Sequence, residues 1–143
     1  MSLPASPRRD DGRLPARYAA LCARAEAFMP PARLVTDALR LLAWGTDASF
    51  YRLVPKIAIV VEAEEEVSRL LALCGELGTP ATFRAAGTSL SGQAVSDSVL
   101  LLLGDGWRRA TPSADGASIT LQPGVIGAAA NRALAPYGRK IGP

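Results

Sequence analysis

Histidine is missing from all 143 residues of this chain. Its absence excludes Ser-His and Cys-His nucleophile pairs, HExxH metal sites and imidazole acid–base chemistry from these residues. Only two cysteines are present, Cys22 and Cys74, and neither belongs to a CxxC pair. We therefore expect both to be reduced core residues, and we expect no metal site. Any chemistry must come from a cofactor or lie elsewhere.

Long apolar runs are missing as well. The strand-like run Val99–Leu103 is far shorter than the roughly 20 residues that span a bilayer, and the N-terminus lacks the apolar core of a signal peptide. We therefore expect a cytoplasmic chain with no transmembrane segment. Sixteen basic against 13 acidic residues give a net charge of +3, which is too mild to indicate nucleic-acid binding.

The order of apolar patterns along the chain predicts one α+β domain. Residues 1–14 show no periodicity and are expected to form a mobile tail. Two helices follow, at residues 15–30 and 32–44, the second ended by Gly45. These make an N-terminal helical segment over residues 15–44.

A small, mainly parallel sheet should follow the two helices. The β-branched run at residues 57–61 is typical of a strand buried on both faces. Residues 63–77 form an amphipathic helix capped by Gly78, and residues 81–85 complete a βαβ unit. Further strands are expected at residues 99–103 and 117–122, and a helix at residues 126–135.

The stretch RAAGTSLSGQ, residues 84–93, directly follows a predicted strand. Gly87 and Gly92 allow positive φ, so successive N–H groups can converge on phosphate oxygens. Hydroxyls of Thr88, Ser89 and Ser91 would add hydrogen bonds, and Arg84 would add charge if it points toward the loop. The stretch matches neither a Walker A motif nor GxGxxG. An ordinary Ser/Gly-rich connector explains the same composition equally well.

Several stretches in order resemble a known family. They are TDASFYR at residues 46–52, PK at 55–56, RAAGTSLSGQ at 84–93, LQPGV at 121–125 and YGRKIGP at 137–143. Over residues 45–143 the chain resembles the N-terminal part of the PCMH-type, vanillyl-alcohol-oxidase-like FAD-binding domain. The resemblance is greatest to bacterial FAD-linked D-lactate and D-2-hydroxyglutarate dehydrogenases of the glycolate-oxidase-subunit type.

The resemblance implies a set of cofactor-binding residues. The backbone at Ala86, Gly87, Thr88, Ser89, Gly92 and Gln93 would surround the FAD pyrophosphate, with Arg84 positioning the loop. Pro123, Gly124 and Val125 would line the adenosine or ribityl side, and Ile141, Gly142 and Pro143 would begin a turn along the flavin. Without histidine, these residues would hold FAD noncovalently.

In the complete protein the resemblance implies hydride transfer from a D-2-hydroxyacid such as D-lactate to the flavin. The catalytic residues, and any iron–sulfur cluster, would lie beyond Pro143, so the chain alone is expected to be inactive. The complete protein would be cytoplasmic or membrane-peripheral, and an open cleft would favour a homodimer. The alternative is a noncatalytic fragment, or a nucleotide-diphosphate-binding or assembly module.

Four other clusters have simpler interpretations. The polar residues Asp47, Ser49, Tyr51 and Arg52 would contact substrate or a neighbouring subdomain, or cap a turn leading into the first strand, and the turn is favoured. The sequence WRR at residues 107–109 is expected at a solvated corner, and Glu62 with residues 64–66 at a helix start. Arg139 and Lys140 either steer an anion toward the flavin or lie on the surface; the sequence favours neither.

Overall fold

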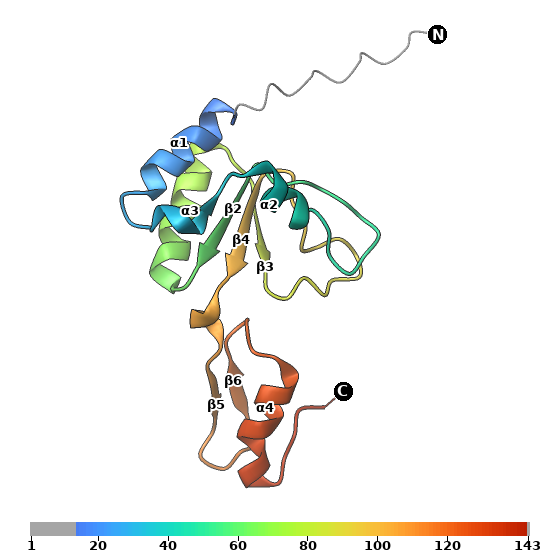
Figure 1. Ribbon diagram of the computed structural model, residues 1–143. Helices are drawn as coiled ribbons and strands as arrows, with labels where there is room; N and C mark the ends of the chain where they lie inside the picture. Colours follow the sequence, from blue (N-terminus) through green and yellow to red (C-terminus); the bar gives the residue numbers. More distant parts are fainter. Residues whose placement is uncertain (1–13, 143) are drawn as a thin grey trace.

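The computed structural model describes residues 14–142 and shows two lobes joined by a neck (Figure 1). The sheet lobe, residues 14–103, contains α1 (Ala16–Ala25), β1 (Leu34–Val35), α2 (Ala38–Ala43), β2 (Ile57–Val61), α3 (Glu64–Leu77), β3 (Ala81–Arg84) and β4 (Val99–Leu103). The neck is residues 104–107. The hairpin lobe, residues 108–142, contains β5 (Ala110–Pro112), β6 (Ile119–Leu121) and α4 (Gly127–Leu134). Short 3-10 turns lie at Pro31–Arg33, Asp105–Trp107 and Ala135–Tyr137.

The architecture confirms the expected α+β class, with one change in strand order. The main sheet runs β1-β2-β4-β3, with β4 parallel to both neighbours and β1 antiparallel to β2. The predicted βαβ elements exist, but β2 and β3 are not neighbours because β4 lies between them. A central place suits β4, since four of its five residues are fully or almost fully buried.

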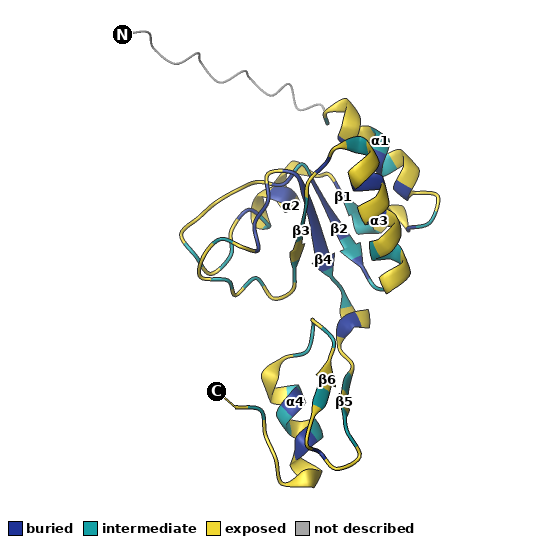
Figure 2. Cartoon of the chain, turned by 180° about the vertical axis from the view of Figure 1, so that it is seen from behind, coloured by how far each residue is buried: buried dark blue, intermediate teal, exposed yellow. Residues whose placement is uncertain are grey.

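Two apolar layers cover the sheet unequally. On one face, Ile57, Ile59 and Leu101 pack against Tyr18 and Leu21 of α1 and against Leu70, Leu73 and Cys74 of α3. On the other face, Ala58, Leu100 and Leu102 meet the smaller cluster of Val35, Leu41 and Trp44. Figure 2 shows β2 and β4 as the buried centre of the lobe. The α2 side is therefore the thinly covered side.

The predicted helix over residues 32–44 is wrong in its first half. Pro30 and Pro31 start a 3-10 turn, and Leu34 and Val35 then pair with β2 as β1. The α-helix begins only after Asp37, whose side chain accepts a hydrogen bond from Arg40 N at 2.9 Å. α1 also ends at Ala25 rather than continuing to residue 30. The missed signal was the β-branched Val35 followed by a capping residue.

The neck contains a further departure from expectation. Trp107 is only 8% exposed, and its Nε1 donates to Val61 O at 2.9 Å. The interpretation of residues 107–109 as a solvated corner is therefore wrong for Trp107, although Arg108 and Arg109 are exposed. In the hairpin lobe the strand expected at residues 117–122 is β6, and its partner β5 was not predicted.

The expected bounds of α3 are confirmed. Glu64, Glu65 and Glu66 occupy the first turn of α3, and Gly78 ends that helix at φ 61°. Cys22 and Cys74 are free thiols, and burial raises the pKa of each. No helix in the described range is long and apolar enough to cross a membrane. The predicted tail lies outside the described residues apart from Leu14.

Glu66 forms a partly buried ion pair with Arg33. Its carboxylate accepts from both terminal nitrogens of Arg33, at 2.9 and 2.6 Å, and from Glu62 N at 2.8 Å. Burial alone would raise the pKa of Glu66, but the hydrogen bonds and the charge of Arg33 hold that pKa below its ordinary value of 4.5. Its stabilising contribution is therefore complete above the ordinary pKa and is lost as pH falls through the folded value.

We predict that Glu66→Gln lowers the free energy of unfolding by about 1–3 kcal/mol at pH 7, because a charge-assisted hydrogen-bond pair is weakened. The difference from wild type should shrink as the pH falls below the ordinary pKa of 4.5 and through the lower folded value. Urea unfolding at neutral and acidic pH measures both values, with exposed Glu64→Gln as the control. An equal loss at both pH values would contradict the role of the charge.

Candidate functional site

A cleft of about 410 Å³ opens between the two lobes, at the carboxyl ends of β3 and β4. Open sheets with parallel strands commonly bind ligands outside this edge. The sheet lobe contributes the loop after β3 and the last residue of β4, and the hairpin lobe contributes Arg108 and the turn that enters α4. The lining residues are Ala85, Ala86, Thr88, Leu103, Gly104, Arg108, Pro123, Gly124, Val125, Ile126 and Gly127.

The glycine loop, residues 84–94, forms one wall of this cleft. Gly87 and Gly92 adopt φ values of 70° and 73°, which confirms the positive φ expected of both. The hydroxyl of Ser89 accepts from Ser91 N at 3.2 Å and from Gln93 N at 3.1 Å, so it is used within the loop. Among residues 14–142, no group accepts from the N–H groups of residues 87–89. These three amides are thus available to an anion.

Arg84 fastens the base of the glycine loop. Its Nη1 donates to Thr46 O at 2.6 Å and to Ala94 O at 3.3 Å, and its guanidinium lies 5.3 Å from the centre of the Trp44 ring. A Cβ placed on Gly87 would overlap the guanidinium, so the loop backbone rests directly on this side chain. Arg84 does not line the cleft. Its contacts are with the loop and with the connector that precedes β2.

The opposite wall is held against the neck by backbone hydrogen bonds. Gly124 N donates to Trp107 O at 2.9 Å, and a Cβ on Gly124 would stand 2.7 Å from that oxygen. Glu62, at the end of β2, accepts from Gly106 N at 2.5 Å. The glycines at positions 106 and 124 therefore permit approaches that a side chain would block.

The predicted site residues fall into three groups. Ala86, Thr88, Pro123, Gly124 and Val125 line the cleft together. Arg84, Gly87, Ser89, Gly92 and Gln93 belong to the loop but do not line the cleft. Ile141 lies in a separate hollow, Gly142 is exposed, and Pro143 falls outside the described residues.

Sequence reasoning missed six lining residues: Ala85, Leu103, Gly104, Arg108, Ile126 and Gly127. Two signals were available for them. Leu103 and Gly104 end the most apolar strand, and the ends of adjacent parallel strands meet at one edge of a sheet. Ile126 and Gly127 directly continue the predicted turn at residues 123–125 into α4.

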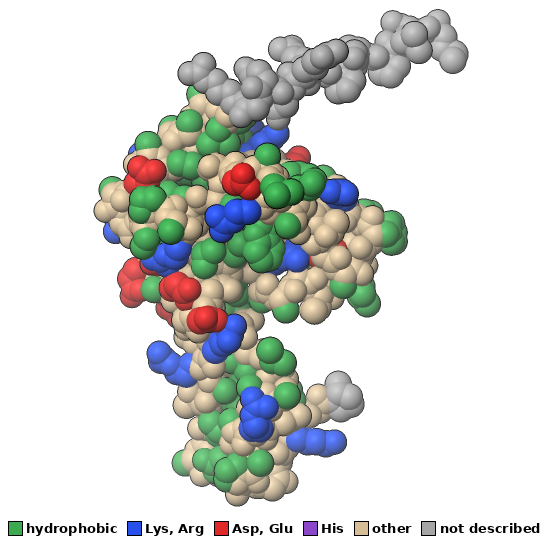
Figure 3. Space-filling model, in the orientation of Figure 1, with side chains coloured by type: hydrophobic (Ala, Val, Ile, Leu, Met, Phe, Trp, Pro, Cys, Tyr) green, Lys and Arg blue, Asp and Glu red, His purple; other side chains and the backbone are tan. Residues whose placement is uncertain are grey.

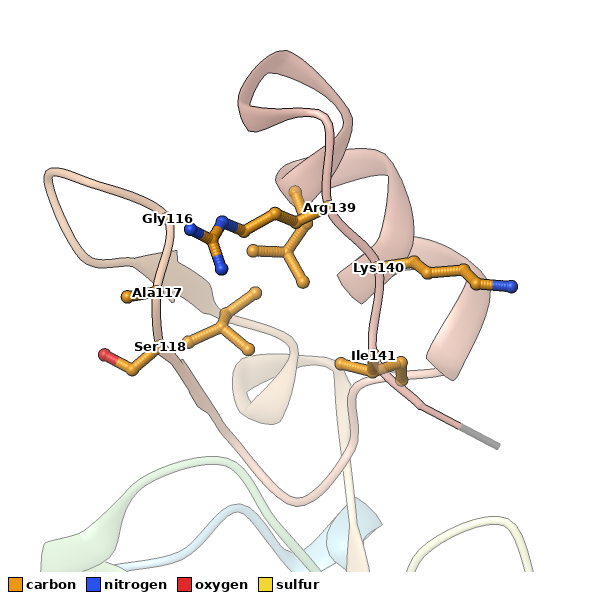
Figure 4. A pocket seen from close by; sticks show the side chains of 8 residues that line it. Gly116, Ala117, Ser118, Arg139, Lys140 and Ile141 are labelled. Atoms are coloured by element: carbon orange, nitrogen blue, oxygen red, sulfur yellow. The ribbon is translucent and has the colours of Figure 1, made fainter.

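The second hollow, of about 360 Å³, lies on another side of the hairpin lobe (Figure 4). Arg139 extends across it toward the Gly116 turn, whereas Lys140 points away. It shares no lining residue with the cleft. Of the two alternatives for Arg139 and Lys140, this placement favours the surface.

The hairpin lobe is nevertheless electropositive. Residues 108–142 contain five basic side chains and a single acidic one, Asp115. Figure 3 shows Lys and Arg on the hairpin lobe, whereas Asp and Glu appear at the neck and on the sheet lobe. Arg108 at the cleft pairs with Asp105 at 2.6 Å, with both side chains largely exposed. The cleft therefore faces a lobe whose net charge favours an anionic ligand.

The cleft combines loop amides without a protein acceptor, glycines that allow close approach and one basic residue, Arg108, at the carboxyl edge of parallel strands. The chain belongs to the family described as FAD binding domain, which matches residues 55–143. The glycolate oxidase subunit GlcD of Escherichia coli K12 is 34% identical over 91 residues. That match covers 62% of this chain and 18% of the relative.

Two solved structures show the same fold. Alkyldihydroxyacetonephosphate synthase matches with a TM-score of 0.69 at 18% identity, over 85% of this chain and 25% of that one. p-Cresol methylhydroxylase matches with a TM-score of 0.68 at 11% identity, over 85% and 25% of the two chains. The chain thus spans about a fifth to a quarter of these relatives.

We predict that Gly87→Ala lowers the free energy of unfolding by about 1–2 kcal/mol, because alanine disfavours positive φ and its Cβ would overlap Arg84. Gly75→Ala is the matched control: this glycine lies within α3, and its added Cβ has no neighbour within 4 Å. The control should gain about 0.5–1 kcal/mol of helix stability. Denaturant unfolding measures both variants. An equal change in the free energy of unfolding would contradict the requirement for glycine at position 87.

Proposed function

We propose that this chain binds the ADP half of FAD noncovalently, in the cleft between the glycine loop and the turn at residues 123–127. The observation that carries the proposal is the cleft itself. It unites Ala86 and Thr88 with Pro123, Gly124 and Val125, two segments separated in sequence, at the carboxyl edge of the sheet. Its volume lies within the range of roughly 300–1,000 Å³ that is typical of ligand pockets.

Each wall has a distinct role in this proposal. The amides of residues 87–89 donate to the pyrophosphate oxygens, because no protein group in the described range accepts from them. The turn at residues 123–125 presents a largely apolar surface to the adenosine or ribityl portion. Arg108 and the basic hairpin lobe attract the anion from a distance. These residues would hold FAD noncovalently, because they include no histidine for a covalent link.

The reaction class rests on the family resemblance and on the similarity to a glycolate oxidase subunit. We propose that the complete protein oxidises the CH–OH group of D-2-hydroxyacids such as D-lactate. The bound flavin supplies the acceptor for the hydride leaving C2 of the substrate. The residues of this chain bind and orient the nucleotide half of the cofactor, and substrate-binding groups and the general base come from further protein.

The competing proposal is a module without activity of its own. Exposed apolar side chains favour an assembly role, since Leu39, Phe50 and Leu90 are 76%, 88% and 77% exposed. A surface of this kind is normally covered by a partner or by a second copy. Sedimentation of the chain at rising concentration tests for dimers, and dimer formation without FAD binding would favour assembly.

FAD binding can be tested by replacing a residue that projects into the cleft. Ala86→Leu should weaken FAD and ADP binding at least about tenfold, because the larger side chain occupies ligand volume. Ala114→Leu, exposed in the β5–β6 turn, is the control and should bind like wild type. Flavin fluorescence polarisation gives both affinities. If wild type shows no saturable response to FAD or ADP, the proposed function is wrong.

The substrate class has its own test. In the complete protein, anaerobic D-lactate or glycolate should bleach the absorbance of oxidised flavin, and L-lactate should act far more slowly. The 143-residue chain loaded with FAD should remain oxidised with all three acids. Failure of every 2-hydroxyacid to reduce the complete protein would contradict the proposed substrate class while leaving FAD binding intact.

A further inference from the structure

Behind the glycine loop lies the connector between α2 and β2, residues 44–56. Three hydrogen bonds join the two segments. Ala48 N donates to Gly87 O at 3.0 Å, and Arg84 Nη1 donates to Thr46 O at 2.6 Å. Ala94 N donates to an Asp47 carboxylate oxygen, Oδ2, at 3.3 Å. The loop is thus supported by a segment that does not line the cleft.

Asp47 holds a turn with one oxygen and the loop with the other. Its Oδ1 accepts from Ser49 N at 2.9 Å and from Ser49 Oγ at 2.5 Å, which is a capped turn as expected from the sequence. Oδ2 is left to receive the N–H of Ala94. The hydrogen bond from the Ser49 side chain, the backbone hydrogen bonds and the charge of Arg84 lower the pKa of Asp47. The carboxylate is therefore ionised at neutral pH.

Both polar backbone groups of Ala94 are held by this pair of opposite charges. Its N–H donates to Asp47, and its carbonyl accepts from Arg84 Nη1 at 3.3 Å. Ala94 is buried, at 9% exposure, and marks the point where the exposed loop re-enters the sheet lobe. Ala48 N also donates to Gly87 O. These hydrogen bonds therefore fix both ends of the segment 87–94, which includes the amides of residues 87–89 that have no acceptor in the described range.

These hydrogen bonds matter because residues 87–94 contain no helix or strand that would hold their backbone in place. A loop that must order itself on binding loses affinity to the entropy of ordering, and a preorganised loop avoids that loss. We propose that Asp47 is a positioning residue for the cofactor loop: with Arg84 it fixes Ala94 and thereby preorganises the amides of residues 87–89, without touching the ligand. This inference rests on the proposed FAD binding and adds a residue outside the cleft.

The test compares two carboxylates of the same local geometry. Asp47→Asn keeps an oxygen for Ser49 but replaces the acceptor of Ala94 N with an amide that cannot accept. Asp115 caps the β5–β6 turn in a similar way, accepting from Ser113 Oγ at 2.7 Å and from Ala117 N at 3.0 Å, and does not line the cleft. In the 143-residue chain, Asp47→Asn should bind FAD roughly tenfold more weakly, and Asp115→Asn should match wild type.

Amide hydrogen exchange without ligand separates positioning from general destabilisation. Asp47→Asn should accelerate exchange at Ala94 and Ala48 and leave the core amides of β4 unchanged. Ser49→Ala, which keeps the Ala94 contact, should lose far less FAD affinity. Suppose that wild type binds FAD but Asp47→Asn shows unchanged FAD affinity, or unchanged exchange at Ala94. Either result overturns the role of Asp47 and leaves the proposed function standing. Absence of FAD binding by wild type instead overturns the proposed function and, with it, the role of Asp47.

Discussion

The parallel pairing of β3 with β4 is the constraint on which the site depends. Because β3 and β4 are parallel, the chain leaves the carboxyl end of β3 and must cross back to the other end of the strands before it enters β4. Such crossovers are usually helices, whose backbone groups satisfy one another. Here residues 85–98 contain no helix, so the loop takes its hydrogen bonds from Arg84, Asp47, Ala48 and Ser89. The amides of residues 87–89 are left without an acceptor among residues 14–142, and these are the amides we propose for the pyrophosphate.

The second wall depends on how the neck leaves β4. Trp107 closes the end of the core and bonds Val61 O, while its own carbonyl accepts from Gly124 N. One residue therefore belongs both to the apolar core and to the support of the cleft. Glu62 adds a further link through Gly106 N. Stability of the sheet lobe and placement of the turn at residues 123–125 are coupled through this neck.

Local chemistry made much of this predictable. β-branched and leucine-rich runs identified β2 and β4, glutamates and Gly78 bounded α3, and the glycines of the loop indicated positive φ. Strand order was not predictable from local patterns. β4 lies between β2 and β3 because both of its faces are covered in the folded domain. β1 was hidden inside a helical pattern, and Trp107 beside two arginines resembled a surface corner. The importance of Asp47 emerged only when the fold brought it to Ala94, far away in sequence.

The central claim is that the glycine loop and the turn at residues 123–127 form one nucleotide site. Backbone amide chemical shifts recorded during an ADP titration of the 143-residue chain test it most directly. The account predicts saturating shifts concentrated at residues 87–89 and 124–127, with little change at residues 116–118 or in α1. Shifts centred on the Gly116 hollow, or none in the glycine loop, would contradict it.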